Sequence, residues 1–152
     1  MLCIIIIVAS IALDQYTKFL ANNNLSAIDT YPVINNVFHL TFVKNRGAAF
    51  GILQNQRWFF ITITFVIILV IIYYLLRHKP DNKLMLVSLA MIIGGAVGNL
   101  IDRIRLGYVI DFFDFRLINF AVFNVADSFI VVGTILFSYY LLFIHTEEKE
   151  ER

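Results

Sequence analysis

The chain has 152 residues, a formal net charge of +1 at pH 7, and a composition that is 60% hydrophobic and only 15% charged. A soluble domain of this length exposes too much surface to hide so many apolar side chains, so the composition predicts an integral membrane protein. The small net charge gives no indication of a nucleic-acid partner. One cysteine, Cys3, excludes an internal disulfide, and the scattered His39, His78 and His145 do not suggest a metal cluster. We therefore expect no metal and no cofactor.

Four apolar segments approach the length of about 20 residues that a helix needs to cross a bilayer. They comprise residues 2–20, 58–76, 84–101 and 121–144. The first segment lacks a basic start and a small-residue cleavage site before Asp14, so we expect a retained helix rather than a cleaved signal peptide. The pattern predicts an all-α membrane protein with four transmembrane helices, forming a single integral membrane domain over residues 1–152.

The connections between the segments differ in character. The first, residues 22–57, begins with the turn-rich "NNNLSAIDTYP" and continues with the alternating "VFHLTFV", which predicts a small sheet lying on the membrane. The third, residues 102–120, is of medium length and rich in aromatic residues. In the third apolar segment, Gly94 and Gly98 have the spacing that favours close contact between helices.

Unusual polar residues gather on one side of the predicted bundle, where the first and third spans end and the second and fourth begin. Asn99 and Asp102 are one helical turn apart, and Asn124 and Asp127 repeat that spacing. A carboxylate in an apolar run such as that around Asp127 costs roughly 2.5–3.5 kcal/mol, so we expect it to face a polar crevice. The other members of this group are Asp14, Lys18, Lys44, Asn45, Arg46, Arg103, Asp111 and Asp114.

Structural interpretations compete with functional ones at these positions. Asp14 and Lys18, four residues apart, fit a local ion pair in which Lys18 extends toward the bilayer surface. Asp102 and Arg103 fit a pair that caps the third helix.

Two other acids carry structural alternatives as well. Asp114 and Arg116 fit ordinary loop charges, and an acid such as Asp127 is favoured near a helix N-terminus by the helix dipole. Spacing favours a functional Asp127 and does not rank its partner among Asp102, Asp111 and Asp114.

Carboxylates dominate the chemistry of this polar side, and we find no plausible Ser–His or Cys–His pair there. Two adjacent carboxylates cannot both ionise comfortably and therefore share one proton. One of them then activates water while the other protonates a substrate carbonyl, as in aspartic proteases. The competing use of buried acids is a proton or ion pathway.

Four segments together resemble the motifs of the bacterial lipoprotein signal peptidase family, also called signal peptidase II, in order and over the whole chain. They are "DQYTK" (14–18), "NRGAAFG" (45–51), "GNLIDRIRLGYVIDF" (98–112) and "FNVADS" (123–128). The resemblance implies an intramembrane aspartic endopeptidase of the bacterial cytoplasmic (inner) membrane, multi-pass, with its active site near the extracytoplasmic face. It implies cleavage of prolipoproteins before their diacylglyceryl-modified cysteine, which releases the signal peptide.

The same resemblance implies the site and the fold around it. The catalytic pair falls on Asp111 and Asp127. The implied fold adds a small extracytoplasmic β-cradle, here residues 22–57, and an amphipathic segment, here residues 102–120. The supporting or substrate-binding positions are Asp14, Lys18, Asn45, Gly47, Asn99, Asp102, Arg103 and Asn124.

The resemblance also implies that the enzyme interacts with prolipoprotein substrates, membrane lipids and the cyclic peptide inhibitors of the family, with no cofactor and no nucleic acid. In this arrangement Phe112, Phe113, Phe115 and Phe120 are expected to anchor the third connection at the membrane surface.

Two observations keep alternatives open. In the implied orientation five Lys and Arg residues lie on the cytoplasmic side and seven on the other, so the positive-inside rule does not support this orientation. A proton or ion conductor and a non-catalytic binder of lipidated peptides would use the same acids, and a cleavage assay separates the enzyme from both.

Overall fold

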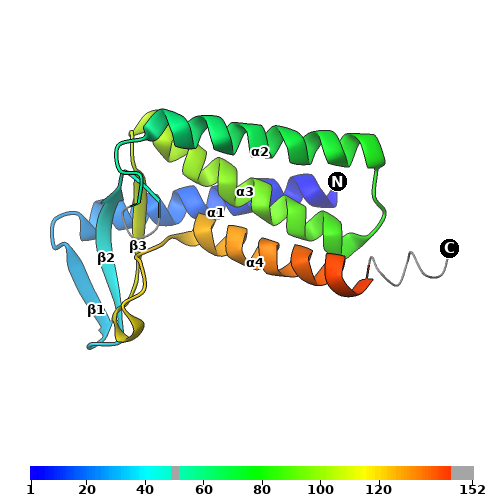
Figure 1. Ribbon diagram of the computed structural model, residues 1–152. Helices are drawn as coiled ribbons and strands as arrows, with labels where there is room; N and C mark the ends of the chain where they lie inside the picture. The colour runs from blue at the N-terminus through cyan, green and yellow to red at the C-terminus, as the bar shows by residue number, and fades with distance from the viewer. Residues whose placement is uncertain (49–51, 145–152) are drawn as a thin grey trace.

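The computed structural model describes residues 1–48 and 52–144 (Figure 1). Residues 49–51 of the "NRGAAFG" segment, together with His145 and the charged tail, lie outside the described residues. Four helices in this part of the chain are long and apolar enough to cross a membrane. They are α1 (Leu2–Leu25), α2 (Arg57–His78), α3 (Lys83–Arg105) and α4 (Val125–Tyr139), which continues into η3 (Tyr140–Ile144).

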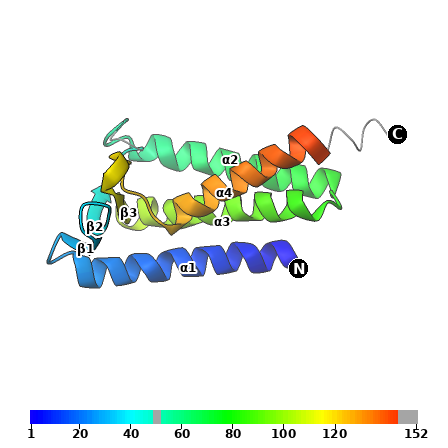
Figure 2. The same cartoon turned by 90° about the horizontal axis from the view of Figure 1, so that it is seen from below.

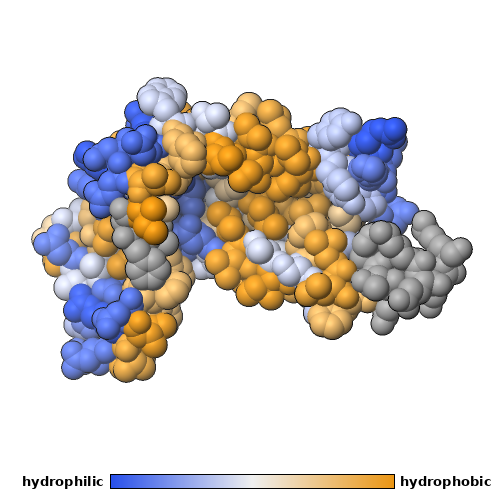
Figure 3. Space-filling view, viewed as in Figure 1, coloured by the Kyte–Doolittle hydropathy of each residue, from blue (hydrophilic) through white to orange (hydrophobic). Residues whose placement is uncertain are grey.

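A three-stranded antiparallel sheet lies at one end of the helices, with the order β1-β2-β3 (Figure 1). Its strands are β1 (Thr30–Ile34), β2 (Phe38–Asn45) and β3 (Val109–Phe115). The mostly helical architecture with a small sheet confirms the predicted fold class. In the space-filling view apolar residues cover the sides of the bundle, and hydrophilic residues gather at its two ends (Figure 3).

Several boundaries differ from the prediction because tertiary contacts extend or shorten the elements. Helix α1 continues to Leu25 because Ala21 and Leu25 pack in a buried cluster with residues of β3. Helix α3 continues to Arg105, so Asp102 lies in a helix and not in the third connection. Helix α4 starts at Val125, because the residues before it are extended and Phe123 pairs with Phe113 of β3.

The third connection contains strand β3, which was not predicted from the sequence, and one of the four expected membrane-anchoring phenylalanines is buried by it. Phe112 is buried and packs against Ala21 and Leu25, so it cannot serve as an anchor. Phe115 and Phe120, two of the other expected anchors, are exposed, as are the apolar side chains of the short helix η2 (Arg116–Ile118) between them, so the anchor stays a prediction for this part of the connection.

Helix α3 is the centre of the bundle and contacts α1, α2 and α4 (Figure 2). Its glycines permit this packing: Gly94 lies against Ser10 of α1, Gly98 against Asp14 of α1, and Gly95 against Ala126 of α4. The predicted close packing at Gly94 and Gly98 is confirmed. These contacts fix the positions of α1 and α4 along α3, and so bring their polar residues next to those of α3.

A methyl group at Gly98 is expected to destabilise the protein. An added Cβ would lie 2.5 Å from Asp14 Oδ2, so Gly98→Ala must displace the buried Asp14 carboxylate or push α1 and α3 apart. Overpacking of this kind typically costs about 1–3 kcal/mol, measurable as a lower unfolding midpoint in detergent. Ile104→Ala, at an exposed position of the same helix, is the control and should melt close to wild type. An unchanged midpoint for Gly98→Ala would contradict the close approach.

Candidate active site

Asp111 and Asp127 reach the same cavity from two separate elements. Asp111 lies in the middle of β3 and is 1% exposed, while Asp127 lies in the first turn of α4. Both line a cavity of about 600 Å³ at the end of the bundle that carries the sheet. The pairing of Phe113 with Phe123 folds the chain back between them, so acids 16 residues apart in sequence come together.

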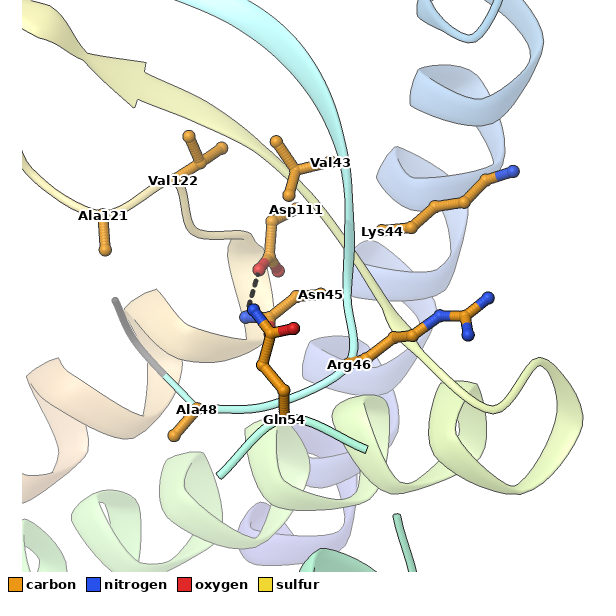
Figure 4. Close-up of a pocket in the computed structure, with 9 residues that line it drawn as sticks. All are labelled: Val43, Lys44, Asn45, Arg46, Ala48, Gln54, Asp111, Ala121 and Val122. Carbon is orange, nitrogen blue, oxygen red and sulfur yellow. Dashed lines mark hydrogen bonds between the residues drawn. The ribbon is translucent and has the colours of Figure 1, made fainter. Parts of the chain in front are cut away.

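Side-chain amides hold the Asp111 carboxyl group on both oxygens. Asn124 Nδ2 donates to Oδ1 at 2.6 Å. Asn45 Nδ2 donates to Oδ2 at 2.9 Å, and Figure 4 shows the Asn45 and Asp111 side chains facing each other from the neighbouring strands β2 and β3. The amide of Asn45 is itself oriented because its Oδ1 accepts a hydrogen bond from the backbone N–H of Gly47 at 2.9 Å.

Asp127 is held in the same manner by a side chain and by the start of its own helix. Asn99 Nδ2 donates to Oδ1 at 2.7 Å, and the backbone N–H of Asn124 donates to Oδ2 at 3.2 Å. Asn124 also caps α4, because its Oδ1 accepts from the backbone N–H of Asp127 at 2.9 Å. This capping box explains the Asn-x-x-Asp spacing of the fourth span.

Burial raises the pKa of Asp111 from its ordinary value of 3.8 to about 7. The charge of Asp127 adds to the increase, and the hydrogen bonds from Asn45 and Asn124 oppose it. Because the pKa of Asp111 is higher in the folded state than in the unfolded chain, its protonated carboxyl group stabilises the fold most at low pH. This contribution to stability decreases with rising pH and is lost as the pH passes through about 7. Asp111 therefore retains its proton mainly below about pH 7 and is half ionised near that pH.

Removing the neighbouring charge should make Asp111 a stronger acid. In Asp127→Asn the repulsion that raises its pKa is gone, so its titration midpoint should fall below the wild-type value of about 7. Carboxyl ¹³C NMR of labelled aspartate in detergent measures this midpoint, with the signal identified by its loss in Asp111→Asn. A midpoint that does not move would show that the two groups do not interact.

A buried ion cluster lies behind the two acids. Lys18 Nζ contacts Asp14 Oδ2 at 2.9 Å and Asp102 Oδ2 at 3.0 Å. Lys18 is only 2% exposed, so the local ion pair is confirmed and the expectation that Lys18 extends to the bilayer surface is wrong. Gln15 Nε2 donates to both carboxylates of the cluster, a contact that the sequence prediction missed. The one feature of the sequence that could have indicated a role for Gln15 was its place in the segment "DQYTK".

Arg103 faces the cavity rather than pairing with Asp102. Its guanidinium donates to the carbonyl oxygen of Gly47 at 3.3 Å and stacks 4.8 Å from the ring centre of Phe60. Consecutive helix residues point about 100° apart, which separates Arg103 from the Asp102 carboxylate. The predicted capping pair is therefore wrong.

Asp114 belongs to a different environment from that of Asp111. It accepts hydrogen bonds from Thr41 Oγ1 at 2.6 Å and from Arg116 Nε at 2.9 Å, and the interactions with Thr41 and Arg116 lower its pKa. The pairing with Arg116 confirms a structural partner for Asp114, but Asp114 is buried in β3 and is not the loop charge that was expected. Asp114 is not among the described residues that line the cavity. Within residues 1–48 and 52–144, no cluster of three His, Cys, Asp or Glu side chains could hold a metal ion.

Comparison with known proteins identifies the family to which a chain of this architecture belongs. The model of the family described as signal peptidase (SPase) II matches residues 6–143. The chain belongs to the signal peptidase II family. It is 56% identical over 142 residues to the lipoprotein signal peptidase of Caldanaerobacter subterraneus subsp. tengcongensis, with 93% of this chain and 97% of the relative covered. It is 50% identical over 149 residues to that of Clostridioides difficile, with 98% and 100% covered.

Solved structures described as bacterial membrane enzymes share the fold of this signal peptidase II family member. One superposes with a TM-score of 0.88 at 34% identity, covering 99% of this chain and 92% of that one. A second gives a TM-score of 0.83 at 35% identity, covering 93% of this chain and 92% of that one.

Within the described residues of this signal peptidase II family member, Asp111 lines a second, smaller cavity besides the larger one, and the two differ in character. The larger, already described, has an apolar wall formed by residues such as Phe123, Ile130 and Val131. The smaller, about 270 Å³, approaches from the β2 side, where Lys44 and Arg46 line its rim (Figure 4). The wall of the larger cavity is mostly apolar, whereas polar and charged side chains form a larger share of the smaller one.

Proposed function

We propose that the chain is an intramembrane aspartic endopeptidase that removes signal peptides from diacylglyceryl-modified prolipoproteins by cutting before the lipidated cysteine. One observation carries the aspartic mechanism: Asp111 and Asp127 line one cavity, and amide or backbone N–H groups hold both oxygens of each carboxyl group. Membership of a peptidase family and the names of the relatives support the substrate.

Asp111 is the general acid in this proposal and Asp127 is the general base. The raised pKa of about 7 favours a proton on Asp111 below that pH, while Asp127 accepts N–H hydrogen bonds on both carboxyl oxygens. Asp127 takes a proton from water as the water oxygen bonds to the scissile carbonyl carbon. Asp111 gives its proton to the carbonyl oxygen, and a gem-diol forms.

Collapse of the gem-diol returns both acids to their starting states. Asp127 passes its new proton to the amide nitrogen of the cysteine, and the C–N bond breaks. Asp111 recovers a proton from one hydroxyl group as the new carboxyl group of the signal peptide forms. The products are that carboxyl group and a free amino group on the lipidated cysteine, so the atoms of one water molecule are consumed.

The surroundings of the acids fit a substrate that arrives from the bilayer. The apolar wall of the larger cavity on α4 accommodates the signal peptide and the acyl chains. Asn99, Asn124 and Asn45 orient the carboxyl groups, and Arg103 braces the loop at Gly47 that borders the cavity. We place the site near the extracytoplasmic face of the bacterial inner membrane.

A cleavage assay with defined products tests the proposal. The purified protein in detergent is incubated with a prolipoprotein that does or does not carry diacylglycerol on its cysteine, and mass spectrometry identifies the cut. We expect a single cut before the modified cysteine and little cutting of the unmodified chain. A cut at another position, or equal cutting of both substrates, would contradict the assignment.

A further inference from the structure

We propose that Lys18 is a positioning residue whose ammonium group fixes the side-chain amide of Asn99 with its Nδ2 directed at Asp127. Lys18 Nζ donates to Asn99 Oδ1 at 2.9 Å, and Asn99 Nδ2 donates to Asp127 Oδ1 at 2.7 Å. The inference rests on the proposed role of Asp127 and adds a residue that touches neither substrate nor the reacting acid.

The direction of the amide follows from the chemistry of an ammonium group. A lysine ammonium has three N–H donors and no acceptor, so any group that faces it at hydrogen-bond distance must offer an oxygen. Asn99 therefore turns its oxygen to Lys18 and its NH₂ to Asp127, and Asn124 Nδ2 donates to the same oxygen at the longer distance of 3.1 Å. The opposite rotamer would place donor against donor at Lys18 and Asn124 and oxygen against oxygen at Asp127, which loses all three hydrogen bonds.

All three donors of Lys18 have partners, which holds the ammonium in place. Besides Asn99, it contacts Asp14 Oδ2 and Asp102 Oδ2 at 2.9 and 3.0 Å. The group is 2% exposed, so water cannot easily replace any of these partners. A buried ion cluster is a weak source of stability, because desolvation offsets much of the attraction, and its best-supported use is to fix one arrangement.

The cluster is also tied to the backbone immediately before each acid. Asp14 Oδ1 accepts from the backbone N–H of Ala126 at 2.9 Å, one residue before Asp127. Asp102 Oδ2 accepts from the backbone N–H of Ile110 at 3.2 Å, one residue before Asp111. The two carboxylates that hold Lys18 are thus hydrogen-bonded to the residues that precede Asp127 and Asp111. These bonds place the ammonium in a fixed position relative to both acids.

Two substitutions of equal length separate donation from simple filling of space. Lys18→Gln and Lys18→Met are both neutral and have the same number of side-chain atoms in line, but only Gln can donate to Asn99 Oδ1. Each is made together with Asp14→Asn, which keeps the net charge of the cluster and retains an oxygen for the N–H of Ala126. Lys83→Met, at the exposed far end of α3, is the control for loss of a lysine and should leave kcat unchanged.

Cleavage kinetics then give a direct result. We expect the Met variant to lose about 10- to 100-fold in kcat with KM little changed, and the Gln variant to retain several-fold more kcat than Met. In an Asn99→Ala background the difference between Gln and Met should disappear, because the partner is gone. Equal kcat for Gln and Met, or a difference that persists without Asn99, would overturn the inference.

A second readout does not depend on activity. The side-chain ¹⁵N–¹H₂ signals of Asn99, identified by their loss in Asn99→Ala, should be sharp with Lys18 present and broadened or shifted in the Met variant. An unchanged signal would overturn the inference even if the protein cleaved nothing. Failure of the proposed function would appear differently, as a wild-type protein that does not cut the lipidated substrate.

Discussion

Asp111→Asn and Asp127→Asn are each expected to abolish cleavage of a lipidated prolipoprotein while the protein still folds. Asparagine has nearly the same size and can occupy either position, but its amide can neither accept nor deliver the proton that hydrolysis moves. Loss of an acid or base of this kind typically costs about 10²–10⁴-fold in rate, and both steps depend on the pair, so we expect the upper end of that range. Single-turnover cleavage in detergent measures it.

Asp114→Asn is the matched control for these two variants. It is the same substitution, on the same strand as Asp111, but its carboxylate contacts Thr41 and Arg116 outside the cavity. We expect it to retain most of the wild-type rate. A folded Asp111→Asn or Asp127→Asn protein that cleaves at a substantial fraction of that rate would refute the proposed pair.

The second large effect is expected at Asn124, which combines two roles in one side chain. Its Nδ2 donates to Asp111, and its Oδ1 caps α4 by accepting from the N–H of Asp127. Asn124→Ala should therefore lose about 1 kcal/mol or more of stability from the cap and, through misplacement of Asp111, about 100-fold in kcat.

Asn124→Ser separates the two roles. A serine oxygen can still cap α4, but serine has no NH₂ group to donate to Asp111 and Asn99. We expect its unfolding midpoint to return close to wild type while kcat stays low. If kcat recovered together with stability, the amide would have no role in holding Asp111 and the asparagine would be only a cap.

Hydropathy alone was enough to locate the four helices, because a bilayer demands long apolar segments whatever surrounds them. Strand β2 also followed from alternation in "VFHLTFV". Strand β3 did not, because "VIDFFDF" is apolar on both faces and its partner is β2, far away in sequence. Its identity as a strand depends on that tertiary pairing and on the buried cluster with α1.

Spacing alone could not distinguish the three acids Asp102, Asp111 and Asp114, which lie within 13 residues. In the structure Asp102 pairs with Lys18, Asp111 accepts hydrogen bonds from two asparagines, and Asp114 pairs with Arg116. Asp111 and Asp114 are an odd number of residues apart, so a strand turns them to opposite faces. This separation depends on strand β3, which the sequence pattern did not predict. The family resemblance supplied the assignment instead.

Joint catalysis by Asp111 and Asp127 is tested most directly by a crystal structure of the wild-type protein at a resolution that shows ordered water in the cavity. We expect one water molecule within hydrogen-bond distance, about 2.6–3.2 Å, of carboxyl oxygens from both Asp111 and Asp127. Such a water is the nucleophile, placed between the acid that keeps a proton and the base that takes one. Carboxyl groups that face apart, each with separate water, would contradict joint catalysis by this pair.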